Sequence, residues 1–206
     1  MGFSTGVVMI RGDHRSDIRG LFAAFDYGWT NQTQRVTSFD AAISPMQWHP
    51  GDNRPSHLVY KSVAFVSGWT VVLDGELLMF DDKLACITLA RRVGQPVFTA
   101  VCQSTSNTYG FSFFNPDCQR SCRISDGEVT EDIGPRLDAE SGIELTDMGE
   151  CEVLSVMKHV GVDYSVIEHL KEFIVVELDE SHFESSRPVA TPPALPAQAS
   201  PWWKFW

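Results

Sequence analysis

The chain of 206 residues is 43% hydrophobic and 11% aromatic, and its formal net charge is −11. This apolar content is enough for a folded core and excludes a globally disordered protein. No apolar run approaches the ~18 residues of a membrane-spanning helix, and five cysteines without a secretory signal pattern favour a reducing compartment. We therefore expect a cytoplasmic protein without a membrane span.

The charge is distributed unevenly along the chain. Residues 1–110 contain nine basic and nine acidic side chains, whereas residues 124–186 contain seventeen acidic side chains against three basic ones. Such a region repels phosphate and anionic membrane surfaces, so we expect no nucleic-acid partner. Either the acids keep the domain soluble, or they form a docking surface for a basic protein that includes Glu128, Glu131 and Asp132.

The first sixty residues predict a strand, a helix and a second, polar strand. Residues 6–10 form a short apolar run that is typical of a buried strand. Ser16 or Asp17 is suited to cap a helix, because apolar side chains then recur at helical spacing, at Ile18, Leu21, Phe22 and Phe25. Residues 31–39 predict a polar edge strand, and residues 44–57, with three prolines, predict a loop.

Residues 62–114 have the densest apolar patterning of the chain. Larger and smaller apolar side chains alternate over residues 63–73, which predicts a strand with one well-buried face. Ser67 and Gly68 interrupt this pattern, either as a two-residue hairpin turn or as a glycine bulge within one long strand. The sequence does not separate these two alternatives.

A short helix and two strands follow within the same stretch. Asp81-Asp82 supplies an N-cap, Gly94 and Pro96 end the helix, and its expected apolar face is Leu84, Ile87 and Leu89. Residues 97–102 and 109–114 predict strands, and we expect one aromatic face of the second to lie in the core, formed by Tyr109, Phe111 and Phe113.

The acidic part of the chain predicts a strand over residues 118–124 and then an irregular loop over residues 127–147. Asp147 and Glu150 have the spacing of a capping box for the helix that follows. The expected buried face of this helix is Val153, Val156, Met157 and Val160. Asp163 caps a further short helix, and residues 173–178 predict a strand.

These elements predict a single α+β domain over residues 1–184, with a mainly antiparallel sheet flanked by about four helices. Residues 185–200 are rich in proline and alanine and predict a flexible linker. Residues 201–206 form a C-terminal aromatic motif whose members are Trp202, Trp203, Phe205 and Trp206. We interpret this motif as a docking segment for another protein, with folding back onto its own domain as the alternative.

No motif for catalysis or cofactor binding occurs in the sequence. Cys118 and Cys122 have the spacing of half a zinc site, but no second ligand pair follows them. Cys122 lies between arginines and is the best candidate for a thiolate nucleophile. Loop side chains that would have to meet in space for an acid–base or metal site are His14, His49, His57, Asp13, Asp52 and Asp74. We therefore expect no catalytic residue, no cofactor and no metal.

The interpretation that fits these observations best is a non-catalytic protein of immunity or adaptor type that binds a basic protein partner. Bacterial immunity proteins that neutralise basic toxins have this charge character, which is an analogy of composition and not of sequence. The alternative is a small-molecule-binding sensor or an enzyme with a pocket near the loop from Trp48 to His57.

Overall fold

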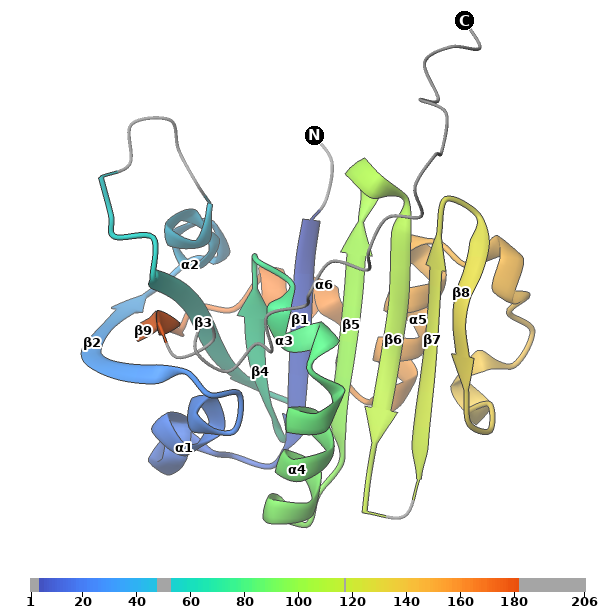
Figure 1. Cartoon of the computed structure of the whole chain (residues 1–206), viewed down its shortest axis with the longest axis horizontal. Coiled ribbons are helices and arrows are strands. Elements are labelled where there is room, and N and C mark those ends of the chain that lie inside the picture. Colours follow the sequence, from blue (N-terminus) through green and yellow to red (C-terminus); the bar gives the residue numbers. More distant parts are fainter. Residues whose placement is uncertain (1–3, 48–52, 117, 182–206) are drawn as a thin grey trace, which may run out of the picture.

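The computed structural model describes residues 4–47, 53–116 and 118–181. Nine strands form one antiparallel sheet in the order β2-β9-β3-β4-β1-β5-β6-β7-β8, with helices against both of its faces (Figure 1). The strands are β1 (Ser4–Arg11), β2 (Gly28–Val36), β3 (Leu58–Val66), β4 (Trp69–Asp74), β5 (Val97–Gln103), β6 (Thr108–Phe114), β7 (Gln119–Ser125), β8 (Glu128–Ile133) and β9 (Phe173–Asp179).

The described residues contain six α-helices and five short 3₁₀ helices. The α-helices are α1 (Ile18–Ala23), α2 (Phe39–Ile43), α3 (Leu78–Asp81), α4 (Lys83–Val93), α5 (Glu150–Val160) and α6 (Tyr164–Glu168). The 3₁₀ helices are η1 (Arg15–Asp17), η2 (Ser44–Met46), η3 (Ser104–Ser106), η4 (Asp138–Glu140) and η5 (Leu145–Asp147). The expected α+β class and antiparallel sheet are confirmed, but the helices outnumber the four that were predicted.

The sheet separates two apolar cores because side chains alternate between its faces along each strand. Val7 and Met9 of β1 belong to the core that also contains the buried side chains of α5 and α6. Val8 and Ile10, the intervening residues, belong to the core against α1, α3 and α4. Burial on both sides explains why the central strands read as nearly continuous apolar runs in the sequence.

Several helix caps are confirmed. The Asp17 side chain accepts a hydrogen bond from the Gly20 backbone N–H at 3.2 Å, at the start of α1. The Asp82 side chain accepts one from the Ala85 N–H at 2.9 Å, at the start of α4. Asp163 does the same for α6 through the Ser165 N–H at 3.1 Å.

Ser67 and Gly68 form the two-residue turn of the β3–β4 hairpin, with φ angles of 53° and 76°. Two successive positive φ angles are typical of the turn whose twist matches antiparallel strands. The hairpin means that residues 63–73 are two strands and not one. Phe65 and Trp69 consequently lie on opposite faces of the sheet, in different cores.

The predicted inner face of α4 is right for Leu89, which is buried, and in part for Ile87, which is half-buried against the same core, but it is wrong for Leu84. Leu84 is 75% exposed, whereas the buried side chains of this helix are Ala85, Cys86, Leu89 and Ala90. These positions form one stripe of an α-helix, and the helix turns the small residues towards the sheet. The prediction included the exposed Leu84 and left out the small residues Ala85, Cys86 and Ala90, which share the buried stripe with Leu89.

The acidic stretch also differs from its prediction. Residues 128–133 form β8, which the turn at Asp126 and Gly127 connects to β7, so the stretch is not an irregular loop throughout. The predicted capping box of Asp147 is wrong as well. Helix α5 begins after Gly149, whose backbone N–H donates to Glu152 Oε2 at 2.9 Å.

The domain boundaries at residues 184 and 200 stay predictions, because residues 182–206 lie outside the described part of the chain. The four aromatic residues of the C-terminal motif lie outside it too. Among the helices that the structure describes, none combines the length and the apolar character needed to cross a membrane.

Candidate protein interface

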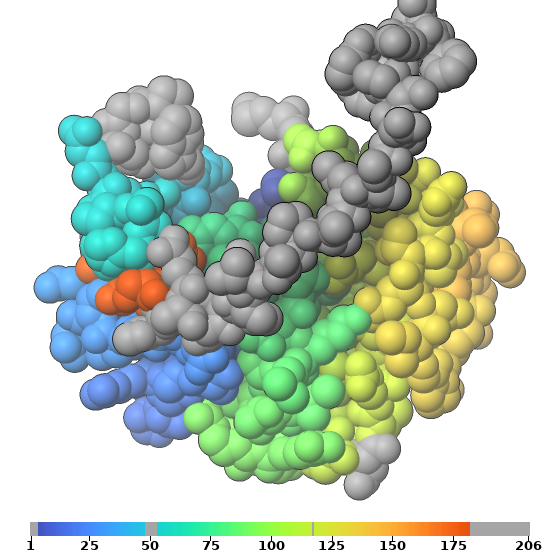
Figure 2. Space-filling model, viewed as in Figure 1, coloured from blue at the N-terminus to red at the C-terminus, as the bar shows by residue number. Residues whose placement is uncertain are grey.

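Strand β8 is one edge of the sheet, and within the described residues it pairs only with β7. In Figure 2 this edge and the segment after it run along the right side of the molecule, in yellow and light orange. Val129 is 40% exposed and Ile133 is 48% exposed, two of the four large apolar side chains that the described structure leaves exposed. An edge strand carries backbone N–H and C=O groups that face away from its neighbour.

A β-bulge shapes this edge. Arg123 of β7 is opposite Glu131, but the next residue, Ile124, is opposite Val129, so Thr130 is the extra residue of β8. The Thr130 hydroxyl donates to the Arg123 carbonyl at 3.3 Å. Bulges increase the local twist of a strand, and at sheet edges they change the direction of individual side chains.

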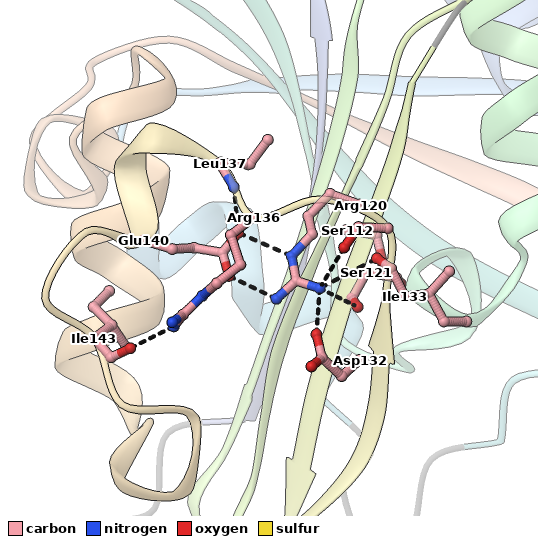
Figure 3. Close-up of polar contacts among 10 residues, drawn as sticks. Ser112, Arg120, Ser121, Asp132, Ile133, Arg136, Leu137, Glu140 and Ile143 are labelled. Atoms are coloured by element: carbon pink, nitrogen blue, oxygen red, sulfur yellow. Dashed lines mark hydrogen bonds and ion pairs between the residues drawn. The ribbon is translucent and has the colours of Figure 1, made fainter.

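Arg120 of β7 anchors β8 to the fold (Figure 3). This side chain is fully buried, and its Nε and Nη2 atoms donate to the two carboxylate oxygens of Glu140 at 2.9 and 2.6 Å. Its Nη1 atom forms an ion pair with Asp132 and donates to the Ile133 carbonyl at 3.2 Å. A planar guanidinium that is bidentate to one carboxylate holds its partners in a fixed geometry.

Glu140 on η4 is the buried partner in this cluster, with its side chain 1% exposed. One of its oxygens also accepts the Leu137 backbone N–H at 2.7 Å. Burial alone would raise the pKa of Glu140, but the hydrogen bonds from Arg120 and from the Leu137 amide outweigh it and lower that pKa below its ordinary value. The carboxylate therefore stays ionised at neutral pH.

The chain can turn from the end of β8 towards η4 because residue 134 is a glycine. Gly134 has a φ of 79°, and a Cβ atom there would lie 1.9 Å from the Gln119 carbonyl oxygen of β7. Only glycine fits such a close approach between two backbones. The tight exit carries the chain directly to Arg136 and η4, where Glu140 meets Arg120.

On the other face of the sheet, Glu131 forms an ion pair with Lys83 of α4. Burial would raise the pKa of Glu131, but hydrogen bonds from Lys83 and Ser121 outweigh it and lower the pKa. Arg123 forms a second ion pair on this face, with Asp81 of α3, and its guanidinium lies 4.7 Å from the centre of the Phe80 ring.

Two of the three acids predicted to contact a partner are thus engaged with the fold. Asp132 holds Arg120 and Glu131 holds Lys83, whereas Glu128 is exposed and forms no ion pair with a described residue. Further exposed acids without an ion pair in the described structure surround it along the chain, namely Asp126, Asp138, Glu144 and Asp147. We call β8 together with these four residues the acidic edge.

Of the histidines and aspartates considered for an acid–base or metal site, the four that the structure describes do not come together. The His14 backbone N–H donates to Thr70, at the end of the sheet where β4 begins. His57 lies at the opposite end, where its carbonyl accepts the Glu180 N–H at 2.8 Å. Asp13 forms an ion pair with Arg15, Asp74 is buried with Lys61, and His49 and Asp52 lie outside the described residues.

Cys122 does not have the setting of a reactive cysteine. Cys122 is buried, and burial raises the pKa of its thiol to about 11, which disfavours the thiolate that a nucleophile requires. Arg123 points to the other face of the sheet, and Arg120 is engaged by two carboxylates. No group of three side chains among the described residues has an arrangement that would hold a metal ion.

The sequence reasoning missed two buried charges, Lys61 and Arg120. Lys61 is an inward residue of β3, fully buried, with its Nζ 2.5 Å from Asp74 Oδ1 and 2.6 Å from Glu76 Oε2. The sequence signal for Lys61 was a single basic residue within an apolar strand pattern, because a buried cation requires an acidic partner.

A pocket lies beside the loop predicted over residues 44–57 and is lined in part by Gln47 and Arg54.

No family model matches the chain, and neither the curated proteins nor the solved structures include one that resembles it significantly. Any assignment of function therefore depends on the geometry of these residues.

Proposed function

We propose that this protein is a non-catalytic binding protein that engages a basic protein partner through the acidic edge. The observation that carries the proposal is the edge strand β8, which exposes Val129 and Ile133 between acidic side chains. An extended segment that pairs with β8 would satisfy its outer backbone groups and cover both apolar side chains. Immunity-type proteins and adaptors that bind a basic protein are examples of this class.

The charge of the edge selects the partner. A second copy of β8 placed beside the first would bring Glu128 and Asp132 against like charges, which disfavours pairing between copies of this chain. Val129 lies opposite Ile124 on one face of the sheet, and Glu128 lies opposite Ser125 on the other. A strand with lysine or arginine at alternate positions could therefore place its basic side chains on the face of Glu128 and its intervening apolar residues on the face of Val129. The proposal therefore commits to a basic, amphipathic, extended segment.

The acids of the edge have different roles in this proposal. Asp132 and Glu131 fix the position of β8 through Arg120 and Lys83, so they act mainly as positioning residues. Glu128 and the acids at 126, 138, 144 and 147 are available to attract the partner during its approach. A charge reversal at Glu131 or Asp132 would disturb the fold, which makes Glu128 the residue of choice for a test.

The test uses two synthetic peptides of the same composition, about ten residues long, as probes of β-strand addition. One alternates lysine and valine, and the other has its lysines and valines in separate blocks. We expect fluorescence anisotropy to show tighter binding of the alternating peptide, weakened by salt because surface charges are screened. The variant Glu128→Lys should lower its affinity about tenfold.

The matched control is Glu168→Lys, an equal change of charge at an exposed position on α6. Helix α6 contacts β3, and five strands separate β3 from β8 in the sheet. It should leave peptide binding unchanged. Equal binding of both peptides would show attraction by charge without strand pairing and would refute the proposal, as would an unchanged affinity in Glu128→Lys. Val129→Thr keeps the size of the side chain and should weaken only the alternating peptide.

The C-terminal aromatic motif is proposed as a second contact with the partner. Tryptophan is the residue type most enriched among the side chains that dominate binding energies. Deletion of residues 201–206 should lower the affinity for the natural partner without changing the melting temperature. A drop in melting temperature would instead support contact of the motif with its own domain, and no change in either property would exclude both roles.

A further inference from the structure

A pocket of about 770 Å³ opens at the end of the sheet where β1 and β3 begin and β4 ends. Figure 2 shows this end at the top, between the cyan residues before β3 and the dark blue start of β1. Five apolar side chains contribute to its wall, namely Phe39, Ile43, Met46, Leu58 and Val59. The volume is within the range of ~300–1,000 Å³ that is usual for sites of small organic molecules.

Acidic side chains dominate the charged part of the lining. Glu76, Glu168 and Glu180 line the pocket, with Arg54 as the one basic residue among the described residues of its wall. The Arg54 guanidinium donates to the Pro45 carbonyl at 2.7 Å and lies 5.5 Å from the centre of the Tyr60 ring. This cation is therefore held against the protein and is not well placed to receive an anionic ligand.

Glu76 connects the pocket to the buried charges behind it. Its Oε2 atom accepts a hydrogen bond from Lys61, while its side chain remains 31% exposed. Asp74 shares the same ammonium and is further satisfied by the backbone N–H groups of Glu76 at 3.2 Å and Met79 at 2.8 Å. Two carboxylates against one ammonium leave this cluster with an excess negative charge, which reaches the pocket through Glu76.

Lys61 remains protonated in this arrangement. Burial would lower the pKa of Lys61, but the charges of Asp74 and Glu76 outweigh it and raise that pKa above the ordinary value. The ammonium thus orients one oxygen of Glu76. The other oxygen, Oε1, forms no hydrogen bond with a described residue, and Glu76 is part of the pocket wall, so this oxygen is available as an acceptor.

We propose that this pocket binds a small organic cation, an amine or a guanidine with an apolar body. The cationic group would donate to Glu76 Oε1, with Glu168 at the end of α6 adding attraction. The apolar body would contact the wall around Met46 and Leu58. This site is separate from the acidic edge, because β5, β6 and β7 lie between β1 and β8 in the sheet.

Three probes of the same shape test the charge requirement: benzylamine, benzyl alcohol and benzoate. We expect benzylamine to bind with a Kd near ~1 mM or tighter in a titration followed by NMR, and to lose affinity as salt is added. Benzyl alcohol should bind at least about tenfold more weakly, and benzoate should not bind.

Two variants locate the site. Glu168→Gln, at an exposed position, should weaken benzylamine several-fold without affecting the fold, and Glu76→Gln should weaken it about tenfold. Glu128→Gln on the acidic edge is the matched control and should bind benzylamine as the unmodified protein does. Urea titration of each variant verifies that the fold is intact.

The proposal is overturned if benzoate binds as well as benzylamine, or if no amine binds at concentrations of ~10 mM. It is also overturned if Glu76→Gln and Glu168→Gln bind benzylamine normally. Each of these outcomes leaves the peptide experiment on the acidic edge unaffected, so the two proposals can fail separately.

Discussion

Replacing Glu140 by glutamine should be among the most destabilising single changes outside the apolar cores. The change keeps the shape of the side chain but removes the charge that faces the fully buried guanidinium of Arg120. Breaking a buried ion pair from one side costs roughly 3–5 kcal/mol, because the remaining charge stays buried. Arg120 retains Asp132, whose side chain is 49% exposed, so we expect the lower end, about 3 kcal/mol.

Urea unfolding measures this cost. With a slope of about 2 kcal/mol per M, a loss of about 3 kcal/mol lowers the midpoint by about 1.5 M while the slope stays the same. The control is the double variant Arg120→Met with Glu140→Leu, which replaces the charges by apolar groups of similar volume. We expect it to be more stable than Glu140→Gln, since a well-packed apolar pair carries no desolvation cost.

The pH dependence provides an independent check. The folded-state pKa of Glu140 lies below its ordinary value of 4.5, so its stabilising effect is present above that value and is lost as the pH falls through the folded-state pKa. The difference in unfolding free energy between the unmodified protein and Glu140→Gln should therefore be constant near neutral pH and shrink in acid. A cost below about 1 kcal/mol at pH 7, or a difference that does not shrink in acid, would refute the reasoning.

Three further changes can be measured in the same urea assay. Phe111→Ala should cost about 3–5 kcal/mol because Phe111 is fully buried and stacks on Phe98, whereas Phe65→Ala should cost clearly less because Phe65 is only half-buried beneath Arg15. Leu84→Ala should change stability by no more than about 0.5 kcal/mol, and a larger loss would contradict the exposed position of Leu84. Asp82→Ala should cost about 1 kcal/mol through the lost cap of α4, and an unchanged midpoint would mean that the cap is not formed.

The sequence predicted the elements whose pattern is local. Alternating aromatic side chains identified one face of β6, the spacing of cap and apolar residues identified α1, and apolar residues at helical spacing identified α5, because one strand or helix carries that signal by itself. It did not reveal β8. That strand lies at an edge, and five of its six residues are exposed. It therefore has no buried face that would produce an alternating apolar pattern.

The site could be predicted only in part for a related reason. An excess of acids is visible in composition, and Glu128 was selected correctly as exposed. Whether Glu131 and Asp132 are free for a partner depends on Lys83 and Arg120, which lie 48 and 12 residues away in the chain. Pairing across such distances follows from the order of strands in the sheet, and no local pattern encodes that order.

The position of β9 has a consequence for how the molecule assembles during synthesis. This last strand of the sheet lies between β2 and β3, and within the described residues β2 pairs with no other strand. During synthesis from the amino end, about 140 further residues must be added after β2, at ~5–20 residues per second, before β9, its neighbour in the described sheet, has been made. The outer edge of β3 stays open for about 110 residues of synthesis, because β3 is made after β2. A ribosome-bound chain therefore exposes an unpaired apolar edge for several seconds, and this nascent form is where we expect dependence on chaperones.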